Sequence, residues 1–492
     1  MGKNNGIKSS YLVELLKSFS SKEISQFDKF LRSQFFNNQN TLVRFFDELK
    51  RYYPDFDSEI FTNKNLFIAV NPTKKYNDVN FRKYVSDLLK IAEKYLSYLK
   101  WDHLCLNKSI NILEQYYHRR LNDLFDRKLN QFEKNKKSTF EADDEYYNLM
   151  HRLEELKYNN LIRDGRPHLA LKSNLNSQYF LLCFFLIKIC DDYQNINVHK
   201  MSFDEKIPVT VSENFFNNFN FKSFLKNATG FSNEQMDFLY IHYYENKLVD
   251  ETTNISNYYK LRDLILKCSK FIGKNLLYIY FSRLNGFCII NTSTGQMNMD
   301  RELFDNFKLM LDRNLFIRED HKILGILEYR SILHVALRLK EFNWTEHFIN
   351  DYKNSVTPDK KQNVYKYGLA NLLFEKKNYL QCLEILSKIE PDYFIIKNDI
   401  HILLAKIYYE LNYYDSALSL IDSSKHFINY NKVFSSKVKL TFTSFFKYYT
   451  QLLKLKIKHS NFKTQKLKEQ ISFDKSMINK SWLLEKIKEL SH

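Results

Sequence analysis

The sequence predicts an all-α protein, and three observations support that class. Gly and Pro together number 15 among 492 residues, about 3% of the chain where about 12% is average. β-Sandwiches need more turn residues, and nucleotide-binding α/β folds need glycine loops. Apolar residues make up 44% of the chain and recur at helical spacing along most of it. Together these features predict an array of antiparallel helical hairpins that follows an N-terminal helical module.

Residues 1–101 are expected to form that N-terminal module. The motif Ser20-Ser21-Lys22-Glu23 has the form of a capping box, in which a serine and a glutamate satisfy the first N–H groups of a helix. Tyr53-Pro54 should end a later helix, because proline pushes the residue before it out of the helical region. Apolar residues at helical spacing open the module: Leu12, Leu15, Leu16 and Phe19.

Residues 102–330 are expected to form a middle part made of further helical hairpins. The polar run at 134–139 and the segment Asp164-Gly165-Arg166-Pro167 separate its first helices. The segment from Asn291 to Gly295 is polar and ends in glycine, which predicts a loop. The next helix should then start near Leu303.

Residues 331–492 contain a sequence repeat with a step of 35 residues, seen in the segments 335–347, 370–382 and 405–417. An aromatic residue recurs in register at Trp344, Tyr379 and Tyr414. Three residues later His347, Cys382 and Ala417 correspond to one another, and so do Val335, Ala370 and Ala405 earlier in each copy. Small residues at such positions allow two helices of a hairpin to approach closely.

This pattern resembles the tetratricopeptide repeat, a helix–turn–helix unit of about 34 residues. The resemblance covers about a quarter of the chain and is clearest in the last two copies. It implies a TPR-like α-solenoid, in which basic C-terminal helices cap the array. Trp482-Leu483-Leu484 with Ile487 is expected to close its end.

In that family the first helix of each repeat lines a concave groove that binds peptides or protein surfaces. The resemblance therefore implies a partner-binding groove at six positions: Tyr367, Asn371, Phe374, Ile402, Lys406 and Tyr409. Members that clamp a C-terminal carboxylate use Lys and Asn on one helix and Arg on a later one. Asn371 matches, but Tyr367 replaces the Lys and Leu403 replaces the Arg, so the aromatic residues favour a more apolar ligand. The same aromatic residues are equally typical of a helical core.

The chain is basic, with 74 Lys and Arg against 57 Asp and Glu and a formal net charge of +17. Such a balance favours nucleic acids, acidic proteins or membrane surfaces as partners. Lysine greatly outnumbers arginine, however, and Asn, Ile, Phe and Tyr are also abundant. Since A/T-rich codons encode these residues, the charge has a compositional explanation as well.

The C-terminal segment 432–489 carries 14 Lys, no Arg and four acidic residues. Lys447, Lys454 and Lys458 follow one another at spacings of seven and four, which places them on one side of a helix. This basic patch predicts an alternative function, in which the chain associates with nucleic acid through its C-terminal helices. A solvated face of a capping helix explains the same pattern.

No motif for catalysis or for a cofactor is found in the sequence. Arg163 and His168 match the loose Arg-x4-His spacing of helical RNases of the HEPN type, but Gly165 and Pro167 place them in a turn. Cysteines do not pair as CxxC, so buried free thiols in a reducing compartment are expected rather than a metal site. These observations predict a protein that is not an enzyme and binds no cofactor or metal.

The most apolar run, from Tyr179 to Cys190, is far shorter than the roughly 20 residues that span a bilayer. With no apolar leader at the N-terminus, a cytoplasmic protein without a transmembrane segment is expected. The sequence thus predicts a scaffold or adaptor that binds a protein or peptide through a helical-repeat surface. The partner and the oligomeric state are left open.

Overall fold

The structure is a computed structural model. Every regular element among its described residues is a helix. These elements are 24 α-helices and a short 3-10 helix at Ile7–Ser9, which confirms the predicted all-α class. The structure describes residues 6–103, 105–135, 143–202, 206–228, 231–316, 324–355, 361–390, 394–430, 436–458, 464–474 and 479–490.

The chain divides into two compact units, residues 1–134 and 135–492. The division expected from the sequence had boundaries after residues 101 and 330. Residue 101 lies within a helix of the first unit, and residue 330 lies within a helix of the second. The apolar core of the second unit continues across the latter position, since one cluster of buried side chains extends from Tyr147 to Ile487.

The first unit begins with the predicted capping box. Glu23 N donates to Ser20 Oγ at 3.3 Å, and Ser20 N donates to Glu23 Oε2 at 2.7 Å. Phe27 and Tyr95 are buried in an aromatic core, in which the Phe27 ring meets Phe46 edge-on at 4.9 Å. The helices are α1 (Tyr11–Ser18), α2 (Ser21–Arg32), α3 (Asn40–Lys50), α4 (Asn63–Val70), α5 (Asp78–His103), α6 (Cys105–His118) and α7 (Asn122–Asn135).

The second unit begins with eight helices that precede the predicted repeats. They are α8 (Asp144–Arg163), α9 (Pro167–Ser202), α10 (Val211–Asn218), α11 (Phe221–Asn227), α12 (Asn233–Asp250), α13 (Ile255–Cys268), α14 (Lys274–Thr294) and α15 (Asp300–Asp312). The loop predicted at Asn291–Gly295 is wrong, because α14 continues to Thr294 and ends at Gly295 with φ 71°. Asn291 is fully buried, and its Nδ2 donates to the Thr252 carbonyl at 2.8 Å, while its Oδ1 has no hydrogen-bond partner within the described structure.

Helix α9 contains the most apolar run of the sequence, and this run packs into the core of the second unit. Cys183 and Cys190 on this helix are fully buried. The described cysteines are all free and buried, as expected, while Cys105 has a side chain outside the described residues. None of the described helices combines the length and the apolar character needed to cross a membrane.

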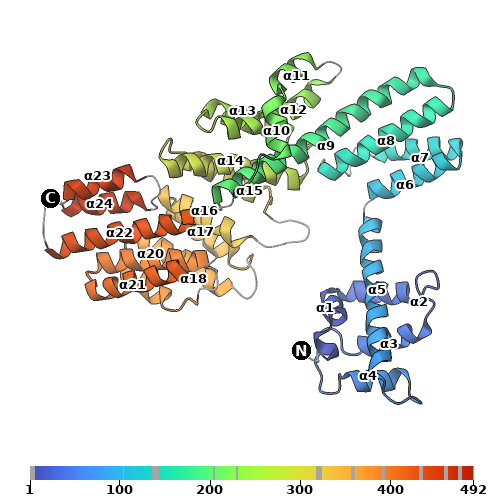
Figure 1. Cartoon of the computed structure of the whole chain (residues 1–492), viewed down its shortest axis with the longest axis horizontal. Coiled ribbons are helices and arrows are strands. Elements are labelled where there is room, and N and C mark those ends of the chain that lie inside the picture. The colour runs from blue at the N-terminus through green and yellow to red at the C-terminus, as the bar shows by residue number, and fades with distance from the viewer. Residues whose placement is uncertain are drawn as a thin grey trace. The chain divides into compact units, whose positions relative to one another are not determined.

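The remaining helices of the second unit contain the predicted repeats. Consecutive helices pack as neighbouring pairs, which Figure 1 shows from yellow to red. They are α16 (Ile326–Arg338), α17 (Phe342–Tyr352), α18 (Lys361–Glu375), α19 (Tyr379–Leu386), α20 (Phe394–Glu410), α21 (Tyr414–Tyr430), α22 (Ser436–Lys458), α23 (Thr464–Phe473) and α24 (Lys480–Leu490).

Three of these pairs share one turn geometry. Lys340, Lys377 and Asn412 adopt left-handed φ values of 59°, 61° and 59° after α16, α18 and α20. The next N–H in each case donates to a carbonyl five residues back, as in a Schellman motif: Glu341 to Ala336 at 3.0 Å, Asn378 to Leu373 at 2.9 Å and Tyr413 to Tyr408 at 2.8 Å. The turns therefore give an independent alignment of the three pairs.

That alignment corrects the first repeat by two residues. Phe342, not Trp344, opens its second helix as Tyr379 and Tyr414 open theirs. Thr345, not His347, takes the position of Cys382 and is fully buried. Thr345 fits this tight position because its hydroxyl donates to the Glu341 carbonyl at 2.8 Å within its own helix. By the same alignment, Leu333 rather than Val335 corresponds to Ala370 and Ala405.

Candidate functional site

The six residues predicted to line a groove are mostly covered by other parts of the chain. Five of them expose between 0% and 8% of their surface, and only Lys406 is partly exposed. The expectation that all six face an open groove is therefore wrong for five of them. They are core or interface residues: Tyr367, Asn371, Phe374, Ile402 and Tyr409.

The corrected alignment reveals the residues of the first repeat that belong to the same helix face. Arg330 corresponds to Tyr367, and His334 corresponds to Asn371. The sequence analysis missed these two residues because its alignment of the first repeat was shifted by two residues. Aligning the first copy on Phe342 instead of Trp344 would have found them in the sequence.

Four residues from three first helices form a connected cluster that we call the polar row: Arg330 and His334 of α16, Tyr367 of α18 and Asp399 of α20. Arg330 binds Asp399 through two nitrogens, with Nη2 at 2.9 Å from Oδ1. The Tyr367 hydroxyl donates to Asp399 Oδ2 at 2.7 Å and lies 2.8 Å from His334 Nε2. The row thus links α16, α18 and α20 through side chains alone.

The electrostatics of the polar row fix its protonation state. Burial would raise the pKa of Asp399, but the charge and hydrogen bonds of Arg330 and the hydrogen bond of His334 hold it well below its usual range. Burial lowers the pKa of His334, against the opposing hydrogen bond to Asp399. Burial also raises the pKa of Tyr367 well above its usual value. At neutral pH the row therefore contains an Asp anion, an Arg cation and neutral His and Tyr.

The polar row is open to solvent at its α16 side. The side chains of Arg330 and His334 expose 31% and 29% of their surface, while Asp399 exposes 9%. One turn further along α16, Arg338 exposes 49% and binds Asp300 through two nitrogens at 2.9 and 2.6 Å. Carboxylates thus hold both guanidinium groups in fixed orientations beside solvent.

The α20 side of the same face is covered by the last helix, α24. The Trp482 ring lies 5.4 Å from the Tyr409 ring, centre to centre, and Lys486 Nζ lies 2.9 Å from Glu410 Oε1. Lys406 Nζ donates to Asn479 Oδ1 at 2.6 Å. Trp482, Leu483 and Ile487, which were expected to close the array, are buried, and α24 packs mainly against α22 and α23.

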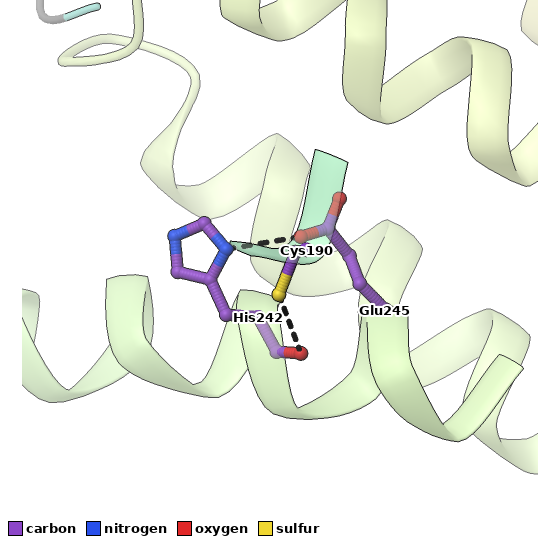
Figure 2. A group of neighbouring side chains, drawn as sticks. All are labelled: Cys190, His242 and Glu245. Carbon is purple, nitrogen blue, oxygen red and sulfur yellow. Dashed lines mark hydrogen bonds and ion pairs between the residues drawn. The ribbon is translucent and has the colours of Figure 1, made fainter. Parts of the chain in front are cut away.

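A second group of chemically active side chains lies between α9, α12 and α14 (Figure 2). Cys190, His242 and Glu245 are fully buried, and their potential ligand atoms lie within 4.8 Å of one another. His242 Nδ1 is 3.0 Å from Glu245 Oε2, and the Cys190 thiol lies 4.0 Å from the His242 carbonyl oxygen. Cys, His and Glu are ligand types that zinc accepts.

The surroundings of this group fit a buried ion-pair network better than a metal centre. Arg283 binds Glu245 Oε1 and also lies 3.1 Å from Asp191 Oδ1. Although burial would raise the pKa of Glu245, the charge of Arg283 lowers it, so the carboxylate already has its counter-charge. Burial raises the pKa of Cys190 well above its usual value, so the thiol adds no charge to this network.

The predicted basic patch lies on α22. Lys447 and Lys454 are exposed, and neither has an ion-pair partner within the part of the chain that the structure describes. The side chain of Lys458 is outside the described residues. The Arg163–His168 pair is split by a turn at Gly165, so the two side chains belong to different helices, α8 and α9.

Comparison of the chain with protein-family models, with curated proteins and with solved structures finds no match in any of the three. The resemblance to tetratricopeptide repeats therefore depends on the sequence repeat, the helix pairs and their common turns.

Proposed function

We propose that this chain is a non-catalytic scaffold of TPR-like repeats that binds a protein or peptide through the face formed by α16, α18 and α20. Three helix pairs with one turn geometry support the repeat, since like turns place like positions on one face. In tetratricopeptide-repeat proteins, which the repeat resembles, this face of the first helices is the concave binding surface.

The observation that carries the proposal is the open side of the polar row. Arg330 and Arg338 are oriented by bidentate contacts to Asp399 and Asp300, and His334 is fixed by Tyr367. Guanidinium groups held in this way offer their remaining N–H donors without a further loss of side-chain entropy. A protein segment rich in carbonyl or carboxylate acceptors is the ligand that such donors fit.

The same contacts support a binding role rather than a catalytic one. A general base needs a pKa near the working pH and a free lone pair toward its substrate. Asp399 instead accepts hydrogen bonds from Arg330 and Tyr367 and has a strongly lowered pKa. These side chains are engaged with one another.

Site-specific photo-crosslinking in cells tests this proposal. A photoreactive amino acid at Arg338 should give discrete protein adducts, because this position borders the open side of the row. The same amino acid at Lys388, an exposed lysine just after α19, is the matched control and should give none. Equal adduct patterns at both positions, or none at Arg338, would contradict the proposal.

The alternative, binding of nucleic acid through α22, is favoured by the exposure of Lys447 and Lys454. Reversing both charges to glutamate should weaken binding of single-stranded RNA and reduce the salt slope by about one to two. The double reversal of Lys222 and Lys226, two exposed lysines of α11, is the control. An equal effect of both double variants would count against a specific basic patch.

A further inference from the structure

Helix α9 turns small and polar side chains toward α8, its neighbour in Figure 1. Ala170, Ser173 and Ser177 follow one another at spacings of three and four and are 1%, 5% and 7% exposed. The Ser177 hydroxyl lies 2.9 Å from Nδ1 of His151 on α8, so this side of α9 faces that helix. A surface helix normally presents its large apolar residues to its neighbour, and over these turns α9 does not.

Large apolar residues lie on the side of α9 that is turned away from α8. Leu171, Leu175 and Phe185 are 64%, 48% and 41% exposed. Between them lie Gln178, which is exposed, and Leu182, which is half-buried. We call these five residues the α9 row. Single exposed apolar residues are common, but spacings of four, three, four and three are those of a coiled-coil seam.

The α9 row lies in apolar surroundings. Leu181 beside it is 46% exposed, and the half-buried Phe215 ring of α10 meets the Phe185 ring edge-on, with 5.1 Å between the ring centres. The row contains no charged residue and extends over about 21 Å of helix. Because contact between apolar surface and water is unfavourable, the row is a surface for a second helix.

The α9 row is symmetric about Gln178. Its first and last residues each lie seven positions from Gln178, and its second and fourth residues lie three and four positions away. When two α9 helices pack antiparallel with Gln178 facing Gln178, Leu171 of each copy therefore meets Phe185 of the other. The Gln178 amide donates one N–H to Asn174 Oδ1 at 2.6 Å within its own helix, which leaves one N–H and the carbonyl oxygen for the second copy. A two-fold interface requires such a surface, in which one patch is complementary to itself.

The charges around the two ends of the row favour an antiparallel pair. Residues 163–172 contain three Lys or Arg residues against one Asp, whereas residues 185–195 contain one Lys against two Asp. An antiparallel pair places these ends of opposite net charge beside each other, while a parallel pair would place like ends together.

We propose that the α9 row is a homodimer interface, in which two copies of this chain pair their α9 helices antiparallel around Gln178. The row is short for an interface between folded chains, so the dimer is reversible and dissociates in the micromolar range. This inference does not depend on the polar row, because α9 contributes no residue to it.

Opposite charges at position 178 test the proposal by sedimentation equilibrium of the full-length chain. The wild-type chain should form dimers. Gln178→Glu and Gln178→Lys should each weaken dimerisation at least tenfold, because the two copies then place like charges in contact. An equimolar mixture of the two variants should restore the dimer, since Glu then faces Lys, and this recovery shows that neither variant is misfolded.

Gln470, an exposed glutamine of α23, provides the matched control. Gln470→Glu and Gln470→Lys should leave dimerisation unchanged. A wild-type chain that stays monomeric well above micromolar concentration would overturn the proposal and would leave the row to a helix of another protein. A dimer that both Gln178 variants leave intact would also overturn it, because the contact between the copies would then lie elsewhere.

Disulfide crosslinking tests the orientation of the two helices. A Leu171→Cys chain mixed with a Phe185→Cys chain should form a crosslinked dimer on oxidation, whereas neither chain alone should do so. The native cysteines that the structure describes are buried, so they contribute little background. Crosslinking of the Leu171→Cys chain to itself would overturn the antiparallel arrangement in favour of a parallel one.

Discussion

Gly368 is the position at which the repeat packing can be tested with a single methyl group. It lies on α18, where a Cβ atom would be 2.3 Å from Tyr329 Oη and 3.1 Å from Ile349 Cγ1. Tyr329 is 1% exposed, so its ring lies among other buried atoms. Gly368→Ala should therefore force α18 away from α16 and α17.

The expected magnitude follows from two opposing effects. Overpacking of a well-packed core typically costs about 1–3 kcal/mol. Alanine is favoured over glycine inside a helix by about 0.5–1 kcal/mol. The net loss of stability in the Gly368→Ala chain should thus lie between about 0 and 2.5 kcal/mol, centred near 1 kcal/mol, and a lower urea midpoint measured by Trp fluorescence will show it. The Gly286→Ala chain is the control, because α14 leaves open space there and the midpoint should rise.

The Tyr329 hydroxyl provides a second check on the same contact. It is buried and has no hydrogen-bond partner within the described structure, so Tyr329→Phe should be neutral or slightly stabilising. Combined with Gly368→Ala, it removes the atom closest to the new methyl group and should recover part of the loss. A Gly368→Ala chain as stable as the wild type, or a double variant with no recovery, would refute the close approach of α18 to α16.

Three further predictions concern a turn, the buried network and pH. Lys377→Gly should raise the urea midpoint, because Lys377 holds φ 61° at a cost of about 1 kcal/mol, whereas Lys366→Gly inside α18 should lower it. Arg283→Met should cost about 3–5 kcal/mol by leaving Glu245 buried without its cation, and adding Glu245→Leu should restore part of the midpoint. Burial lowers the pKa of His401 to about 4 in the folded chain, so on acidification the unfolded chain takes up this proton first. The free energy of unfolding should therefore decrease as the pH falls below about 6.5. The His401→Gln chain should lose less stability than the wild type between pH 7 and pH 5.

Local features of the sequence predicted the helical class and several helix ends correctly. Helix periodicity repeats over every turn, and a capping box such as that of Ser20 involves residues only three apart, so neither depends on the rest of the fold. The left-handed turn at Lys340 has no such signal, because lysine has no preference for that conformation. The sequence also did not identify Thr345 as the small residue of the first repeat, because this residue fits a tight contact between helices only through its hydrogen bond to the Glu341 carbonyl.

The polar row shows how a small register error removes a site from view. Arg330 and Asp399 are 69 residues apart in the sequence, and their contact depends on how two helix pairs are aligned. A shift of two residues turns a helix face by about 200°, which replaces Arg330 with Ile332 on the face of interest. The spacing of apolar residues predicts each helix by itself, whereas the geometry of the turns was needed to align α16, α18 and α20 with one another.

Two sequence expectations concern residues that the structure brings into contact. Lys406 and Tyr409 were expected on the binding face, and Trp482 was expected to close the array. The structure brings them together, so the helix that closes the array also covers part of that face. Periodicity identifies the apolar side of α24 but not the surface that receives it. The α16 side of this face, with Arg330, is therefore partly exposed, whereas α24 covers part of its α20 side.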